Sequence, residues 1–331
     1  MPLVPMKQIL DEAIKGGYGV GAYNVNNMEQ IQGIMQAASE TLSPVIIQAS
    51  RGALKYTKML YLKYLMVAAA EDNPNLPIAI HLDHGNNFET CKQAIALGFT
   101  SVMIDGSLKE DSKTPTTFQE NVEITSEVVE YAHKFGVTVE GELGTLGGIE
   151  DGVGSGKLKL TDPDEAEKFV KLTGVDALAL AIGTSHGAYK FKEAPILAID
   201  IISEVKKRLP EVPLVMHGSS SVPVHLIDII NQYGGNIKHA MGVPISSIQE
   251  AIKRGVKKIN VDTDGRLAIT GAIRKFLAEH PDVIDPREYF GEARKAVYET
   301  VKSKMIDFGS ANHANDYEPL TLADMIKIYE R

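Results

Sequence analysis

The sequence is poor in cysteine, with Cys91 the single example among 331 residues. One thiol excludes an internal disulfide and suits a reducing compartment. The residues around Cys91 follow the pattern of an amphipathic helix. We therefore expect it to pack as a small apolar side chain and not to act as a catalytic thiol.

Long apolar runs are lacking as well. Nowhere do about 18 apolar residues follow one another, which is the length that a membrane-spanning helix needs. The opening residues MPLVPMKQIL do not contain the long apolar core of a secretory signal peptide. These features predict a cytoplasmic protein with no membrane partner.

Positive charge is in short supply, because 34 lysine and arginine residues stand against 43 aspartate and glutamate residues, for a formal net charge of -9. Nucleic acids and anionic membranes attract proteins through a positive field, so neither is expected as a partner. Any phosphate ligand would have to be held by local groups. The 44% hydrophobic and 23% charged residues are otherwise typical of a globular protein.

Eight short apolar segments alternate with helical patterns, and each is typical of a strand buried on both faces. The expected strands are 19–25, 44–50, 77–85, 101–107, 137–144, 177–187, 212–220 and 256–264. This alternation predicts an α/β fold, a (β/α)8 TIM barrel. An open doubly wound sheet would normally carry a glycine fingerprint after its first strand, and GVGAYNV is not one. We expect one barrel domain over about 1–280 with a helical extension over about 281–331.

Amphipathic patterns place helices between these strands. We expect them at 6–15, 28–42, 61–70, 88–97, 119–135, 166–172, 195–209, 223–233 and 244–254, with further helix from about 267 onward. The stretch GTLGGIEDGVGSG has little apolar content to hold it in place, so we expect a mobile loop there.

Three histidines, His84, His186 and His217, fall at the carboxyl ends of predicted strands. Taken alone, each is equally consistent with a hydrogen-bonded structural role. In a barrel, however, these strand ends surround one pocket, and three imidazoles with an open fourth position are a usual arrangement for catalytic zinc. Cobalt or ferrous iron would suit the same ligand types.

Asp83 directly precedes one of these proposed ligands. Strict alternation would point Asp83 and His84 to opposite faces of the strand, so the strand must end here for both to enter one pocket. Gly85 would permit that break. Asp83 then either orients a histidine from behind or moves a proton. His81 is in phase with Asp83 and either supports the site or packs structurally.

Glycine and hydroxyl residues follow two of the histidines, in GTSHGAYK and HGSSS. Backbone N–H groups, Ser220 and Lys190 would suit a phosphate, whose oxygens need several donors. The next strand end, NVDTD, adds Asn260, Asp262 and Thr263, and barrels commonly bind phosphate near strands seven and eight. The alternative is that all of these are turn residues only.

The motifs HLDHG, VEGELG followed by GIEDG, GTSHG, HGSSS and NVDTD, in this order, resemble those of class II, metal-dependent fructose-1,6-bisphosphate aldolases. The resemblance covers nearly the whole chain, including IDPREYF and FGSAN. Such lyases (EC 4.1.2.13) reversibly split fructose 1,6-bisphosphate into dihydroxyacetone phosphate and glyceraldehyde 3-phosphate, in glycolysis, gluconeogenesis or the Calvin cycle. The resemblance also implies a homodimer or homotetramer.

The resemblance implies roles for individual residues. Zn²⁺ would be held by His84, His186 and His217, and an alternative metal position would be served by Asp105 and Glu142. Asp83 would take the proton from the C4 hydroxyl in cleavage and return it to the aldehyde oxygen in condensation. Glu150, on the glycine-rich loop, would exchange the proton at the carbon that becomes nucleophilic.

The two substrate phosphates have separate implied sites. The ketone-side phosphate would be held by Gly187, Lys190, Gly218, Ser220, Asp262 and Thr263, with Asn260 close to the reacting carbons. Ser50 and Arg287 would meet the other phosphate, Arg287 from a neighbouring subunit. A monovalent cation, Na⁺ or K⁺, near Gly187 and Gly218 is a further feature of the family.

Three other functions are consistent with part of this pattern. A tagatose-1,6-bisphosphate aldolase shares the metal and loop chemistry, although NVDTD is more like the fructose enzymes. A barrel metal hydrolase would use zinc to activate water, which leaves the phosphate-suited loops unexplained. A catalytically silent barrel that binds a sugar phosphate is the alternative from another class.

Overall fold

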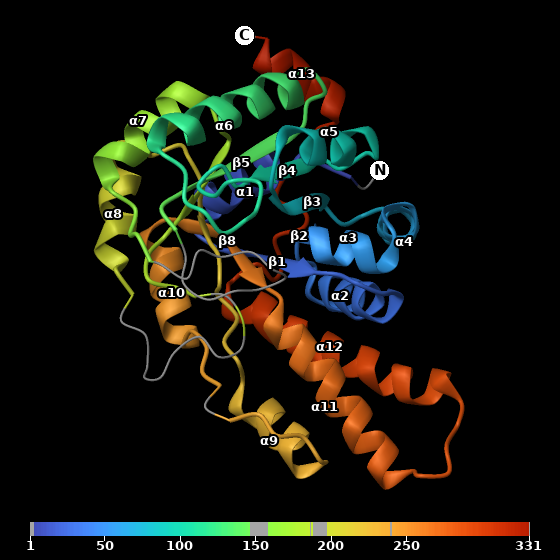
Figure 1. The fold of residues 1–331 in the computed structure, drawn as a ribbon. Coiled ribbons are helices and arrows are strands. Elements are labelled where there is room, and N and C mark those ends of the chain that lie inside the picture. Colours follow the sequence, from blue (N-terminus) through green and yellow to red (C-terminus); the bar gives the residue numbers. More distant parts are fainter. Residues whose placement is uncertain (1–2, 146–157, 186, 188–196, 239, 331) are drawn as a thin grey trace.

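The structure is a computed structural model that describes residues 3–145, 158–185, 187, 197–238 and 240–330. Its strands form a closed barrel in chain order, and every neighbouring pair is parallel (Figure 1). The strands are β1 (Val20–Asn24), β2 (Val45–Ser50), β3 (Ile78–Gly85), β4 (Ser101–Ile104), β5 (Thr138–Leu143), β6 (Ala177–Leu180), β7 (Leu214–Met216) and β8 (Val256–Val261). The predicted (β/α)8 barrel is confirmed.

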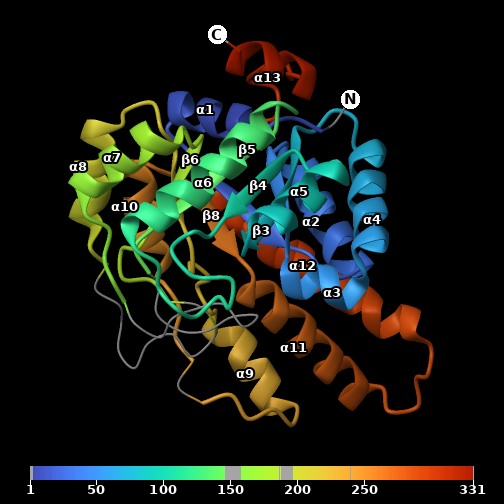
Figure 2. The same ribbon diagram turned by 45° about the horizontal axis from the view of Figure 1, so that its top comes forward.

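Helices cover the outside of the barrel and extend beyond it (Figures 1 and 2). They are α1 (Met6–Gly16), α2 (Met28–Thr41), α3 (Arg51–Thr57), α4 (Met59–Asp72), α5 (Phe88–Ala96), α6 (Phe118–His133), α7 (Pro163–Thr173), α8 (Ile199–Arg208), α9 (Val224–Gln232), α10 (Ile245–Arg254), α11 (Thr263–Glu279), α12 (Pro286–Asp307) and α13 (Leu322–Tyr329). Among these described helices, none is both long enough and apolar enough to cross a membrane.

Local sequence signals account for where several helices begin. The side chains of Asn27 and Asn87 accept hydrogen bonds from the first turns of α2 and α5. Thr117 and Glu120 form a reciprocal capping box at the start of α6. Asp162 caps α7 ahead of a proline at its first position, as the TDPDE stretch predicts.

Helix α1 closes the amino-terminal end of the barrel. Its Met6, Ile9 and Leu10 pack in one buried cluster with inward-facing residues of β1 and β2, among them Ala22 and Ile46. Figure 2 shows α1 and α13 toward one end of the molecule and α9 and α11 toward the other. An apolar plug at one end leaves the carboxyl ends of the strands to form a polar site.

The structure differs from the sequence prediction in the connections. The helix expected at 61–70 lies within α4, but α3 was not predicted, and the two helices meet at Lys58, whose φ is 64°. Helix α11 starts at Thr263, so the last residues of NVDTD begin a helix and do not end a strand.

Helices α11 and α12 run beside each other and extend away from the barrel (Figure 1). Helix α12 returns to pack against α2, where Tyr298 and Lys302 both donate to Glu40. The boundary near residue 280 between barrel and tail stays a prediction.

Candidate metal centre and active site

Polar side chains fill the barrel interior in two layers above the apolar plug. Residues two positions apart on a strand face the same side. The lower layer holds His81, Glu140 and Lys258, whose side chains are fully buried and joined by a 2.9 Å ion pair between Lys258 Nζ and Glu140 Oε2. The upper layer holds the residues two positions further along the same strands, namely Asp83, Glu142 and Asn260.

His84 turns into the same pocket as Asp83 because the strand is distorted at His84 itself. Its φ is +53°, a left-handed backbone conformation that residues other than glycine rarely adopt. The register between β3 and β4 shifts between Leu82 and Gly85. The strand break was assigned to Gly85 from the sequence, but the distorted residue is His84, one position earlier. Gly85 serves close packing instead, since a Cβ there would lie 2.7 Å from both Cys91 Sγ and Met103 O.

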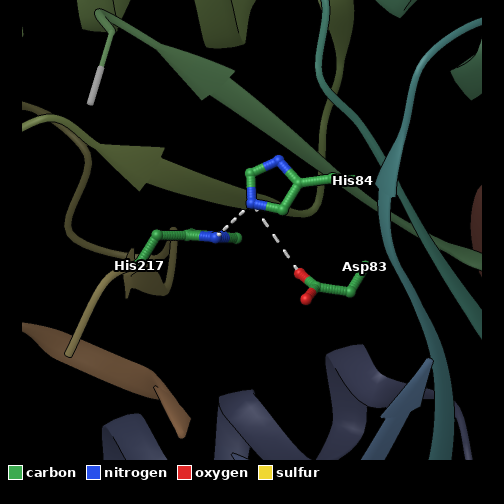
Figure 3. Close-up of side chains that lie close together, drawn as sticks. All are labelled: Asp83, His84 and His217. Carbon is green, nitrogen blue, oxygen red and sulfur yellow. Dashed lines mark hydrogen bonds and ion pairs between the residues drawn. The ribbon is translucent and has the colours of Figure 1, made fainter. Parts of the chain in front are cut away.

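The imidazoles of His84 and His217 face each other at the centre of the site (Figure 3). His84 Nδ1 donates to Asp105 Oδ2 at 3.1 Å, and His217 Nε2 donates to Glu140 Oε1 at 2.7 Å. The other two ring nitrogens, His84 Nε2 and His217 Nδ1, are then 3.0 Å apart with their lone pairs directed at one another. Asn260 Nδ2 also lies 3.1 Å from His217 Nδ1, and a proton or a metal cation between the two rings would satisfy both facing nitrogens.

The surrounding carboxylates favour that positive charge. Burial lowers the pKa of His84, but the hydrogen bond from its ring to Asp105 and the charge of Asp83 outweigh burial and raise the pKa to about 10. Asp83 Oδ1 lies 4.0 Å from His84 Nε2, on the same side as His217 (Figure 3). Ligand atoms of these three residues lie within 4.8 Å of one another. The donor set fits a divalent metal of the zinc type.

A second group of possible ligands lies on the other side of His84. Asp105, Glu142 and His84 also offer ligand atoms within 4.8 Å of one another. Burial and the charge of Asp105 raise the pKa of Glu142 well above its ordinary value. Glu142 Oε2 is buried with no hydrogen-bond partner among the described residues, which is costly unless a cation or proton satisfies it. The predicted alternative metal residues therefore lie together.

Three side-chain amides surround the carboxylate of Asp83. Asn24 Nδ2 and Gln48 Nε2 donate to Oδ2 at 3.1 and 3.3 Å, and Asn260 Nδ2 donates to Oδ1 at 3.2 Å. Lys258 Nζ donates to Asn260 Oδ1 at 2.8 Å. Because an ammonium group has no acceptor, Lys258 fixes which end of the Asn260 amide faces Asp83. Asp83 is thereby held at one orientation beside the two histidines.

His81 lies beneath this site, in the lower layer. Its Nδ1 is 2.8 Å from Ser101 Oγ, and its Nε2 is 3.6 Å from Glu140 Oε2. Burial and the charge of Lys258 hold the pKa of His81 well below its ordinary value. His81 is therefore a neutral, packed residue of the lower layer.

The residues predicted to hold the ketone-side phosphate surround the ends of β7 and β8. Ser220 Oγ accepts from the backbone N–H of Asp262 at 3.2 Å, which joins the two strand ends. Thr263 is buried at the start of α11. Gly218 has a φ of +59°, and a Cβ there would lie 2.6 Å from the carbonyl oxygen of Ser185, so only glycine fits this close approach. Gly187 also has a positive φ, of 86°.

The two residues predicted for the other phosphate are far apart in the fold. Ser50 is buried, and its hydroxyl caps α3 by accepting from the N–H of Ala53. Its strand position pairs with Asp83 across β2 and β3. Arg287 lies in the first turn of α12 on the projecting pair of helices, where it contacts Asp285 and its side chain is 88% exposed. Within one chain the two are not brought together.

Three predicted site residues, Glu150, His186 and Lys190, lie outside the described residues. Sequence reasoning in turn assigned no role to four residues that contact the site: Asn24, Gln48, Glu140 and Lys258. All four point into the barrel. The sequence hint for these residues is the two-residue spacing of a strand. Each lies two positions from another polar residue or close to a strand end, which puts it on the inner face.

The fold and site together are those of a barrel enzyme with two groups of candidate metal ligands at the carboxyl ends of its strands. The family model "Fructose-bisphosphate aldolase class-II" matches residues 4–313. A fructose-bisphosphate aldolase of Giardia intestinalis is 59% identical over 326 residues, covering 98% of this chain and 98% of that protein. One from Pseudomonas aeruginosa is 51% identical, covering 100% of this chain and 98% of that protein.

Solved structures agree with these relatives. The YdjI aldolase from Escherichia coli K12 superposes with a TM-score of 0.76 at 31% identity, covering 95% of this chain and all of that one. A structure described as a putative fructose-1,6-biphosphate aldolase from Coccidioides immitis gives 0.74 at 27% identity, covering 94% and 98%. This chain belongs to the class II fructose-bisphosphate aldolase family.

Proposed function

We propose that this protein catalyses the reversible aldol cleavage of fructose 1,6-bisphosphate to dihydroxyacetone phosphate and glyceraldehyde 3-phosphate. The observation that carries the proposal is Asp83, a carboxylate fixed by three amide donors beside a pair of imidazoles whose lone pairs converge. Family membership and the names of the relatives favour the fructose substrate over tagatose 1,6-bisphosphate.

Zinc is the proposed cofactor, held by His84 and His217 with His186 as the third ligand. A bound divalent cation would supply a Lewis acid that stabilises the negative charge of the enediolate left by breaking the C3–C4 bond. Asp105 and Glu142, on the other side of His84, would hold an alternative metal position. The carboxylates behind each histidine orient the rings and keep the facing nitrogens deprotonated once metal is present.

Asp83 acts as the base in cleavage and the acid in condensation. It accepts the proton of the C4 hydroxyl as the carbon–carbon bond breaks, and returns it to the aldehyde oxygen in the reverse direction. The amides of Asn24, Gln48 and Asn260 keep both carboxylate oxygens in place, which supplies the geometry that proton transfer requires. Asn260 also reaches His217 Nδ1 at 3.1 Å, and the family resemblance implies that it lies close to the reacting carbons.

The remaining roles follow the family resemblance. Glu150 exchanges the proton at the nucleophilic carbon. Gly187, Lys190, Gly218, Ser220, Asp262 and Thr263 bind the ketone-side phosphate, with a monovalent cation near Gly187 and Gly218. Ser50 binds the other phosphate with Arg287 of a neighbouring subunit, which fits the exposure of Arg287 on the projecting helices. The active form is then a cytoplasmic homodimer or homotetramer.

A coupled assay of triose phosphate release tests the function. We expect the purified protein to cleave fructose 1,6-bisphosphate in preference to tagatose 1,6-bisphosphate, to lose activity on chelation and to regain it with Zn²⁺. Activity that survives complete metal removal would contradict the metal mechanism. Zinc-loaded protein that cleaves neither sugar would favour the hydrolase or the binding-protein alternative.

A further inference from the structure

Arg51, the first residue of α3, joins three parts of the structure around the metal centre. Its Nε donates to the main-chain carbonyl oxygen of His84 at 3.1 Å, and its Nη2 donates to Ser112 Oγ at 2.5 Å. Ser112 lies in the segment 107–118, called here the loop 107–118, which follows β4 and ends at the first residue of α6. One guanidinium group thus links the end of β2, the ligand strand β3 and this loop.

The carbonyl of His84 lies at the most distorted point of the strand. The left-handed backbone at His84 turns its ring toward His217 and must be held by its surroundings, because L residues disfavour it. The next peptide is restrained too, since Gly85 O accepts from the N–H of Asp105 at 2.9 Å and Gly85 is packed against Met103. A charged, planar donor on the His84 carbonyl is well suited to fix the remaining rotation.

Asp105 connects the two ends of this arrangement. It accepts from His84 Nδ1, and its charge also acts on Arg51: burial lowers the pKa of the partly buried guanidinium, and Asp105 opposes that effect. The ring of His84 is therefore held by Asp105, while its backbone is held by Arg51. Neither contact uses the His84 nitrogen that faces His217.

We propose that Arg51 is a positioning residue for the metal ligand His84, and that the loop 107–118 strengthens this restraint through Ser112. Arg51 acts through the His84 backbone, so its effect is on metal affinity and ligand geometry. The inference rests on the metal site described under the proposed function. It gives the loop 107–118 a part in building the site.

The test measures metal binding without turnover. Zinc affinity is determined by competition with a chromophoric chelator, and ligand geometry by the visible d–d spectrum of the Co²⁺-substituted protein. Arg51→Ala is expected to weaken zinc binding by about 10–100-fold, the usual effect of removing a group that orients a ligand, and to change the Co²⁺ spectrum. Arg51→Lys keeps the charge but cannot donate to both acceptors in the same fork, so an intermediate loss is expected.

Two further variants separate the contacts. Ser112→Ala removes only the loop contact and should weaken zinc binding less than Arg51→Ala does. Arg254→Ala is the matched control, because Arg254 makes its ion pairs with Glu250 and Asp200 on the outer helices. It should leave zinc affinity and the Co²⁺ spectrum unchanged. If Arg51→Ala does not fold, zinc affinity and the Co²⁺ spectrum are measured on Arg51→Lys and Ser112→Ala instead.

Two results would overturn the inference. Unchanged zinc affinity and Co²⁺ spectrum in Arg51→Ala, with a lower melting temperature of the metal-free protein, would show that Arg51 only supports the fold. A raised KM for fructose 1,6-bisphosphate at saturating zinc, with zinc affinity intact, would make Arg51 a substrate contact. Failure of the wild-type protein to bind zinc would instead reject the metal site itself.

Discussion

His84 Nε2 and His217 Nδ1 lie 3.0 Å apart, and the opposite nitrogen of each ring donates to a buried carboxylate. The carboxylates set the tautomers, and the tautomers leave two lone pairs converging on one point. The metal affinity that we propose for this site would therefore depend on residues that do not touch the metal, because they decide which ring nitrogens are available.

Glu140→Gln tests that dependence. A glutamine amide can present an N–H to His217 Nε2, which would favour the tautomer with its proton on the nitrogen that faces His84. We expect zinc affinity to fall by about 10–100-fold, measured by chelator competition. Lys258 also loses its buried partner, so the melting temperature of the metal-free protein should fall. Glu130→Gln, on the exposed face of α6, is the control, and equal zinc affinity in both variants would contradict the tautomer argument.

Asp83→Asn separates proton transfer from binding. The amide has nearly the same shape as the carboxylate but cannot accept the C4 proton, so we expect kcat to fall by about 10²–10⁴-fold. Bound zinc, measured by atomic absorption, should stay close to the wild-type level because all three proposed histidine ligands remain.

The control for that variant is Asp200→Asn, whose side chain is 97% exposed on α8 and pairs only with Arg254 among the ion pairs of the described residues. It should keep full activity. A turnover of Asp83→Asn within a few fold of wild type would remove the proposed role of Asp83.

Gly85→Ala tests whether the packing after His84 holds the ligand strand. The added Cβ would lie 2.7 Å from Met103 O, a backbone atom that cannot move cheaply. We expect a loss of about 1–3 kcal/mol in the free energy of unfolding, measured by urea denaturation. Gly291→Ala is the matched control: nothing lies within 4 Å of its Cβ in the interior of α12, so helix propensity predicts a gain of about 0.5–1 kcal/mol. Equal stability of the two variants would contradict the packing argument.

Much of the fold was predictable because the spacing of apolar residues in the sequence matches the pattern of burial in the structure. Every residue of β2 and β3 is buried, so these strands appear in the sequence as continuous apolar runs with polar ends. The break between α3 and α4 was not predictable, since it occurs at Lys58, which carries no glycine or proline signal. The start of α11 was misplaced because Asp262 and Thr263 suit a strand end and a helix start equally well.

The candidate site was predictable where residues lie at strand ends and less so one layer below. Asp83, His84 and His217 were placed in one pocket by their positions at strand ends, whereas the proton-transfer role of Asp83 came from the family resemblance. Glu140 and Lys258 were not, because a buried ion pair beneath the site has no motif of its own and shows only as in-phase polar residues. The left-handed backbone of His84 depends on tertiary contacts from Arg51 and Gly85, which no local pattern in β3 reveals.

Cys91 gives the pH-dependent prediction. Its side chain is buried against Gly85, and burial raises the pKa of the thiol to about 12 from an ordinary value of 9.0. Below about pH 9 the thiol is neutral in both the folded and the unfolded chain, so its full contribution to stability is present. As pH rises from about 9 toward 12 only the unfolded chain ionises, and the free energy of unfolding should fall by about 1.4 kcal/mol per pH unit from this group.

Urea denaturation between pH 8 and 11 measures that slope, with Cys91→Ala as the control because it lacks the titrating thiol. The wild-type protein should lose stability more steeply than the variant above about pH 9, and both should share one slope below it. At pH 8 an aromatic disulfide reagent should label Cys91 only as fast as the protein opens. Rapid labelling of the native protein at pH 8, or parallel slopes for the two proteins above pH 9, would show that the thiol is accessible to water and that its pKa is not raised.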